Sequence, residues 1–369
     1  MSTSAPFMPS KIGLERFFVK GGGEEGSALR AVSELPPSAL AEYLAGLRPL
    51  LDEPELTELC INRPFEAFVE RSAGWSVVPL PFASYAWCSQ VARLIAASTQ
   101  QRVSPESPLL SASLPTGERV QVVLPPATSP GTVAITIRRP SDRVMSLESL
   151  SASGLFARCI VGRTNVAPAD AALSDLYARG EVEAFLRLAV RLRRNIVVSG
   201  PTGSGKTTLT KSLLLEIPSD ERLITLEDAR ELVLDRHPNS VRLFYSKDGQ
   251  GQAQVTPKQL LEACLRMRPD RILLAELRSE EAYYYLRNVN SGHPGSITSV
   301  HASSARLAFE QLTLLVKESA AGREMPREDI QSLLYQLVDI VVQCGVEKQR
   351  RFVKELWYGA AERRTTAAA

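Results

Sequence analysis

One stretch constrains the fold of this chain more than any other: residues 200–207 read Gly-Pro-Thr-Gly-Ser-Gly-Lys-Thr. The stretch matches the phosphate-loop pattern G-x-x-x-x-G-K-[ST] at every fixed position. A β-branched run at 196–198 precedes it and indicates a buried strand, and the apolar pattern of 208–216 indicates an amphipathic helix. A strand, a glycine-rich loop and a helix in this order predict an α/β domain that binds a nucleoside triphosphate.

The residue types of the loop explain why it would bind phosphate. Glycines let successive backbone N–H groups converge on one anion at the N-terminus of a helix. Lys206 would reach the β- and γ-phosphates, and the Thr207 hydroxyl would hold Mg²⁺. The alternative is an ordinary glycine-rich turn, which the flanking strand and helix disfavour. The predicted ligands are ATP and Mg²⁺, and the predicted nucleotide-binding residues are Gly200, Pro201, Thr202, Gly203, Ser204, Gly205, Lys206, Thr207 and Thr208.

The composition narrows the class of protein. A chain of 369 residues predicts two domains more readily than one. With 44% hydrophobic and 23% charged residues we expect a soluble globular protein, and no apolar run is long enough to span a membrane. The net charge of +2 gives no general case for nucleic acid as a partner. The five cysteines form no C-x-x-C pair, which favours reduced thiols over disulfides or a zinc site.

The pattern along the chain predicts five segments: an N-terminal extension 1–27, an α+β domain 28–140, a linker 141–180, a P-loop domain 181–361 and a flexible tail 362–369. The α+β domain should contain strands near 56–61, 67–70, 75–78, 119–124 and 132–138, and a helix to residue 98 that Ser84 caps. A short apolar cluster in the extension indicates a helix that packs on the domain or docks on a partner.

The P-loop domain shows alternating strand and helix patterns. Strands are expected at 196–198, 223–226, 271–275, 296–300 and 340–342. Helices are expected at 181–193, 260–267, 280–288, 305–318 and 327–337. This alternation predicts a parallel sheet with helices on both faces.

Two acids follow strands of this sheet directly. In an open α/β sheet the carboxyl ends of the strands face the ligand crevice. We therefore predict that Glu276 contacts Mg²⁺ through water or polarises the attacking water, and that Glu227 orients water or joins the Mg²⁺ shell. The alternatives are structural: Glu276 paired with Arg271 or Arg278, and Glu227 with Asp228 as a carboxylate pair at a helix start.

Histidines and arginines supply further candidates. His293 and His301 bracket the strand at 296–300, and His301 stands at its carboxyl end, where it could hydrogen-bond the γ-phosphate. A single histidine can equally have a purely structural role. Arg119 and Arg138 lie at the ends of predicted strands in the α+β domain, where they could reach phosphate across a domain cleft or remain solvated at the surface.

Residues 265–278, LRMRPDRILLAELR, and 290–302, NSGHPGSITSVHA, form two longer motifs. With the phosphate loop and ITLED at 224–228, they closely resemble the secretion and traffic ATPases, in particular the branch that powers type IV secretion and conjugation. The resemblance is densest from about 190 to 310. It implies a RecA-like C-terminal domain, a smaller N-terminal α+β domain, and a hexameric ring with nucleotide between the two domains.

The resemblance also assigns roles: the acidic box to Glu227, the second acid to Glu276, the histidine box to His301, and phosphate-contacting arginines to Arg119 and Arg138. Ala275 stands where many P-loop ATPases carry aspartate, so Mg²⁺ would be left to Thr207, water and the glutamates.

The family implies that ATP opens and closes the two domains about a hinge in the 141–180 linker. It also implies a homohexamer that works with other secretion ATPases and channel components at the cytoplasmic face of the inner membrane. The alternatives are a pilus-retraction or type II secretion motor, a RecA-like nucleic-acid motor, and a scaffold that binds nucleotide without hydrolysing it. Type II motors often carry a tetracysteine zinc module, which is missing here, and a nucleic-acid motor needs a basic, aromatic-lined channel that the sequence does not indicate.

Overall fold

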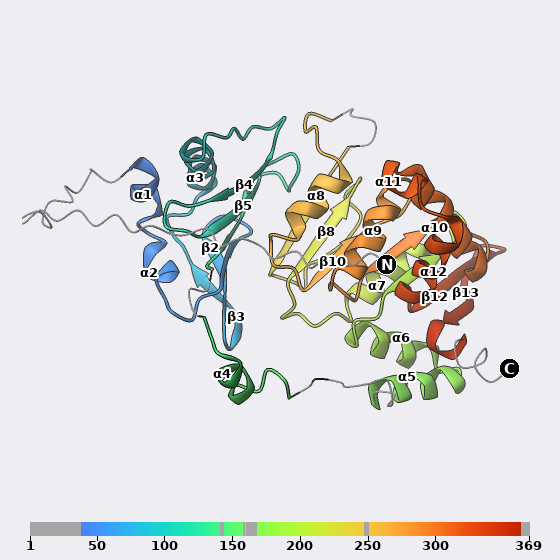
Figure 1. Ribbon diagram of the computed structural model, residues 1–369. Coiled ribbons are helices and arrows are strands. Elements are labelled where there is room, and N and C mark those ends of the chain that lie inside the picture. The colour runs from blue at the N-terminus through green and yellow to red at the C-terminus, as the bar shows by residue number, and fades with distance from the viewer. Residues whose placement is uncertain (1–37, 141–143, 158, 160–167, 247–250, 363–369) are drawn as a thin grey trace, which may run out of the picture. The chain divides into compact units, whose positions relative to one another are not determined.

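The computed structural model describes residues 38–140, 144–157, 159, 168–246 and 251–362, which Figure 1 draws in colour. The predicted extension 1–27, part of the predicted linker and the tail beyond residue 362 lie outside these ranges. The residues from Ala39 onward cluster as one unit. Its described strands form an antiparallel sheet in the first part of the chain and mainly parallel ladders in the second.

The antiparallel sheet has six strands in the order β3-β2-β1-β6-β5-β4. Their bounds are β1 Glu58–Ile61, β2 Glu66–Arg71, β3 Gly74–Pro79, β4 Leu109–Ser113, β5 Arg119–Val123 and β6 Ala134–Arg138. Five of them confirm the predicted strands. The sequence did not predict β4, because the segment LLSAS has no β-branched or aromatic residue and so lacks the usual composition of a strand.

Three helices accompany this sheet: α1 Ala39–Leu44, α2 Arg48–Leu51 and α3 Tyr85–Ser98. The Ser84 hydroxyl accepts a hydrogen bond from the Trp87 backbone N–H, so the predicted N-cap is confirmed. Val91 and Ile95 of α3 belong to one buried cluster with Leu59 of β1. Burial of this helix face against the sheet gives the N-terminal part of the chain a core of its own.

The second part contains the ladders β10-β8-β9 and β11-β7-β12-β13. The bounds are β7 Ile196–Ser199, β8 Leu223–Glu227, β9 Ser240–Phe244, β10 Arg271–Leu274, β11 Ile297–Val300, β12 Ile340–Glu347 and β13 Arg350–Tyr358. All pairs are parallel except β12 with β13. The ladders meet just beyond β10, where the Leu277 N–H donates to the Ser299 carbonyl at 2.9 Å. The predicted parallel sheet is confirmed.

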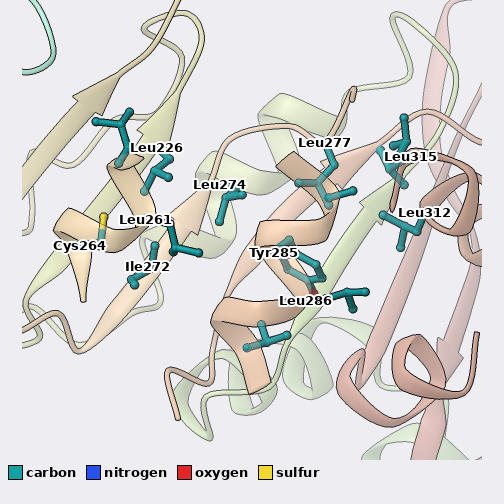
Figure 2. Close-up of a cluster of buried hydrophobic side chains, with 14 of the residues drawn as sticks. Leu226, Leu261, Cys264, Ile272, Leu274, Leu277, Tyr285, Leu286, Leu312 and Leu315 are labelled. Atoms are coloured by element: carbon teal, nitrogen blue, oxygen red, sulfur yellow. The ribbon is translucent and has the colours of Figure 1, made fainter. Parts of the chain in front are cut away.

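The helices that follow the first sheet are α4 Leu147–Ala152, α5 Pro168–Ala178, α6 Val182–Arg191, α7 Lys206–Leu214, α8 Pro257–Cys264, α9 Glu281–Asn290, α10 Ala305–Glu318, α11 Ala320–Arg323 and α12 Arg327–Leu337. Alternate residues of each buried strand enter different clusters. Ile272 and Leu274 of β10 belong to one buried cluster with residues of α8, α9 and α10, several of which Figure 2 shows, whereas Leu273 belongs to another with residues of α5, α6 and α7. The sheet is therefore covered on both faces, as predicted.

In the second part of the chain, α8, β9 and β13 differ from the prediction. Helix α8 begins at Pro257 rather than residue 260, because Thr256 and Gln259 form a capping box that fixes its start. Strands β9 and β13 were not predicted at all. Strand β9 alternates buried and half-buried residues, and most of β13 is exposed, so neither has the continuous apolar run by which the central strands were found.

Candidate nucleotide-binding site

The predicted phosphate loop connects β7 to the N-terminus of α7. Gly203 and Gly205 adopt left-handed backbone angles, with φ of 76° and 92°. A Cβ atom on Gly200 would lie 2.5 Å from Ser204 Oγ and 2.8 Å from the Cys344 carbonyl oxygen, so only glycine fits there. The three glycines let the chain turn tightly into α7 and place backbone N–H groups at the positive end of the helix.

Lys206 is buried at the base of this loop. Its Nζ atom donates to the carbonyl oxygens of Gly200 at 2.9 Å and Pro201 at 3.2 Å, and it lies 3.3 Å from Nδ1 of His301. Burial lowers the pKa of Lys206, while the nearby Glu276 carboxylate acts in the opposite direction. The ammonium group is therefore held by the loop and by a residue from a neighbouring strand end.

His301 follows β11 and connects Lys206 to Glu276. Its Nε2 atom lies 2.8 Å from Glu276 Oε1. Because an ammonium group can only donate, Nδ1 accepts from Lys206 and the ring proton belongs on Nε2, facing the carboxylate. This close approach lacks the alignment of a hydrogen bond, and Glu276 Oε1 has no hydrogen-bond partner among the described residues. The ring thus joins the loop lysine to the acid after β10.

Glu276 has the position predicted for it, at the carboxyl end of the sheet. Its side chain is 8% exposed, and Oε2 accepts a hydrogen bond from Arg278. The guanidinium of Arg278 also donates to Asp228 at 3.0 Å. The predicted structural pairing with Arg278 is therefore present together with the contact to His301, whereas Arg271 pairs with Glu221 instead.

Glu227 ends β8 at the same edge, but its carboxylate is fully buried and both oxygens are occupied. Oε1 accepts hydrogen bonds from the Thr225 hydroxyl at 2.7 Å and from Arg242 at 2.9 Å. Oε2 accepts from Arg242 at 2.8 Å and from the backbone N–H groups of Glu231 and Leu232 at 2.9 and 3.0 Å. These contacts favour a structural role for Glu227 over the predicted contact with water or Mg²⁺.

A model of the family described as "Type II/IV secretion system protein" matches residues 44–356. This chain belongs to that family.

Its relatives cover nearly all of the chain. The Bartonella henselae type IV secretion system protein VirB11 is 46% identical over 346 residues, covering 89% of this chain and 96% of that protein. Protein VirB11 of Agrobacterium fabrum is 43% identical over 324 residues, covering 86% and 94%. The crystal structure of the VirB11 ATPase from the Brucella suis type IV secretion system, in complex with sulphate, aligns with a TM-score of 0.84 at 44% identity over 90% of this chain and 98% of that chain. The predicted family and the RecA-like fold with an N-terminal α+β domain are confirmed.

The other predicted site residues of this family member are more dispersed. Thr207 and Thr208 are exposed on the first turn of α7, beside the loop. Arg119 and Arg138 lie directly opposite each other on β5 and β6. They line a cavity of about 560 Å³ that none of the loop residues 200–207 lines. His293 lies 3.4 Å from the Ser291 hydroxyl and forms no hydrogen bond with residues 200–207 among the described residues.

Two residues of the site were not predicted to act there. The sequence predicts Arg278 only as an alternative partner of Glu276, yet it also donates to Asp228 and so links the segments after β8 and β10. Arg351 of β13 donates to the Gly203 carbonyl oxygen of the loop at 3.0 Å. Since β13 itself was not predicted, no sequence signal placed this residue beside the loop.

Within the described residues, no helix is both long and apolar enough to cross a membrane.

Proposed function

We propose that this protein hydrolyses ATP to power type IV secretion. The observation that supports this most directly is the contact of Lys206, His301 and Glu276 at the end of the phosphate loop, each from a different strand end. The relatives named above are type IV secretion proteins, and the one of known structure is called an ATPase. The same function follows from the motifs of the sequence.

Lys206 is the phosphate-binding cation of the proposed site. Its hydrogen bonds go to two neutral carbonyl oxygens and one imidazole nitrogen. A phosphate oxygen carries negative charge, whereas these carbonyl and imidazole acceptors are neutral, so an incoming triphosphate would draw the ammonium group away from them. The backbone N–H groups at the start of α7 would bind the same phosphates.

Glu276 and His301 would orient the attacking water. A buried carboxylate oxygen without a hydrogen-bond partner is a strong acceptor, because it has lost water without gaining a replacement. Among the described residues, Glu276 Oε1 makes no hydrogen bond and has only the close approach of His301 Nε2 at 2.8 Å. The side chain of His301 is 46% exposed and extends from this acid toward the loop, so it can contact the terminal phosphate or the water. Together they can accept a proton as the water attacks.

Mg²⁺ is the metal that the fold implies, and the residues of the site fit it. The exposed Thr207 hydroxyl at the start of α7 would be its protein ligand, and Glu276 would act on it through water. When bound, the ion would neutralise charge on the phosphates. The described part of the chain has no group of three or more His, Cys, Asp or Glu side chains arranged as a metal site. A metal ion that is held mainly by phosphates and water does not need such a group of side chains.

Arg119 and Arg138 would contact the phosphates from a neighbouring subunit. Both side chains are exposed, and they line a cavity that contains no residue of their own chain's phosphate loop. In a homohexamer, the α+β domain of one subunit could bring this pair to the loop of the next. Arginines supplied in this way stabilise charge that develops during phosphoryl transfer.

The cellular role belongs to the same proposal. The domains 28–140 and 181–361 would move about the 141–180 linker, since contacts to the γ-phosphate from both domains exist only with ATP bound. The ring would act at the cytoplasmic face of the inner membrane, with other secretion ATPases and channel components as partners. These assignments rest on the family to which the chain belongs.

The test is ATP turnover by the purified protein and by Lys206→Ala, paired with complementation of a secretion-deficient strain. We expect the variant to lose both nucleotide binding and export, because it lacks the ammonium group that the loop carbonyls hold at its base. Turnover at the wild-type rate by Lys206→Ala would contradict the assignment of the site. Full export by a strain that carries only this variant would contradict the cellular role.

A further inference from the structure

The β12–β13 hairpin brings a second cation to the phosphate loop. Strand β12 runs beside β7, with Gln343 opposite Ser199, the residue before the loop. Strand β13 returns antiparallel to β12 after a tight turn at Lys348 and Gln349. Figure 1 shows this pair of strands at one end of the sheet. The first residues of β13 therefore lie next to residues 200–205, although they are about 150 positions away in sequence.

Arg351 makes the contact. Its Nε–H donates to the Gly203 carbonyl oxygen at 3.0 Å. Its stem passes over Gly205, since a Cβ atom added there would lie 3.1 Å from Arg351 Cδ. Gly205 thus serves two purposes: it adopts the left-handed angle that starts α7, and it leaves room for this side chain.

The charge at this position is unbalanced. Arg351 is exposed and forms no ion pair among the described residues, in contrast to Arg278, which pairs with Glu276 and Asp228. Both Arg351 and Lys206 lie at the N-terminus of α7, where the helix dipole disfavours cations. Two cations at the positive end of a helix are favourable only when an anion binds between them.

We propose that Arg351 is a second phosphate-binding cation of the site. Its two terminal nitrogens, which Gly203 does not use, would donate to the phosphates of the bound nucleotide. The guanidinium can hold the loop carbonyl and a phosphate oxygen at once, because its donors are fixed in a planar fork. This inference rests on the proposed function, in that the ligand is the phosphate chain of ATP or ADP.

The experiment compares the full-length protein with Arg351→Gln and Arg351→Lys, and with Arg350→Gln as the matched control on the neighbouring residue. ATP and ADP binding is measured by calorimetry at two salt concentrations, and folding is checked by thermal unfolding. We expect Arg351→Gln to weaken binding of both nucleotides about tenfold, the effect of losing one charge-assisted hydrogen bond. The loss should shrink at high salt, since a charge has been removed. Arg351→Lys keeps the charge but not the planar fork, so it should lose less affinity than Arg351→Gln, and Arg350→Gln should lose none.

Wild-type affinity in Arg351→Gln would overturn the proposal. So would an equal loss in Arg351→Lys and Arg351→Gln that does not change with salt, because Arg351 would then only brace the Gly203 carbonyl. Either result can be separated from failure of the proposed function. If the proposed function were wrong, the wild-type protein itself would bind neither ATP nor ADP.

Discussion

Glu227 ends β8 and Glu276 follows the neighbouring strand β10, yet their carboxylates have opposite surroundings. Glu227 is fully buried and accepts five hydrogen bonds, two of them from Arg242. Glu276 accepts one hydrogen bond, from Arg278, and its other oxygen faces His301 without one. Equal position at a strand end therefore does not imply an equal role.

The difference indicates which acid is free to act. A carboxylate whose oxygens are all occupied has no capacity left for water or for a metal's water shell, and it stabilises the fold instead. A carboxylate with an unpartnered oxygen close to the lysine of a phosphate loop retains capacity for a substrate water. We therefore expect loss of Glu227 to affect stability, and loss of Glu276 to affect turnover.

The largest effect on stability is expected for Glu227→Ala. The change leaves Arg242 and two backbone N–H groups without their buried acceptor. Breaking a buried ion pair in this way costs about 3–5 kcal/mol in the free energy of unfolding. Urea denaturation measures it, with Glu183→Ala as the control, because the Glu183 side chain is 85% exposed and its pair with Arg187 should contribute below about 1 kcal/mol. Equal free energies of unfolding for Glu227→Ala and Glu183→Ala would contradict a structural role for Glu227.

Glu58 extends the comparison to a third buried acid. Its Oε1 lies 3.4 Å from Arg138 Nε, and Oε2 has no hydrogen-bond partner in the described structure. Burial raises the pKa of Glu58 from 4.5 to about 7. The folded state thus holds this proton more tightly than the unfolded state, so this residue's contribution to stability is present below pH 4.5 and is lost as pH rises to about 7.

Glu58→Gln should remove that loss. The free energies of unfolding of wild type and variant are measured at about pH 5 and about pH 8. The stability of the variant relative to wild type should rise between these two pH values, by up to about 3 kcal/mol. The glutamine keeps the shape of the side chain without its charge. A difference between the two proteins that does not change with pH would show that Glu58 does not titrate in this range.

His301→Ala tests the link between Lys206 and Glu276. Because His301 contacts both, its loss should lower kcat about tenfold or more while the KM for ATP changes less. A double-mutant cycle with Glu276→Gln separates a shared role from independent ones. The double variant should lose less than the product of the two single effects, since the residues act together. If the double variant lost the full product of the two single effects on kcat, His301 and Glu276 would act independently, which would contradict the link.

The sequence predicted the parts of the site that depend on strand ends. Lys206, Glu276 and His301 were placed correctly because the carboxyl ends of parallel strands share one edge. The surroundings of Glu227 were not predictable, since its partner Arg242 lies on β9, the edge strand that the pattern did not reveal. Arg351 was missed for the same reason, because it lies on β13.

The central claim is that Glu276, and not Glu227, is the acid of ATP hydrolysis. The most direct measurement is single-turnover ATP hydrolysis by Glu276→Gln and Glu227→Gln, with ATP binding measured in parallel at a temperature where both variants are folded. We predict that Glu276→Gln binds ATP but hydrolyses it at least about a hundredfold more slowly, whereas Glu227→Gln, where folded, stays within about tenfold of wild type. A Glu276→Gln variant that turns over at the wild-type rate, or a folded Glu227→Gln variant that binds ATP and does not hydrolyse it, would contradict the claim.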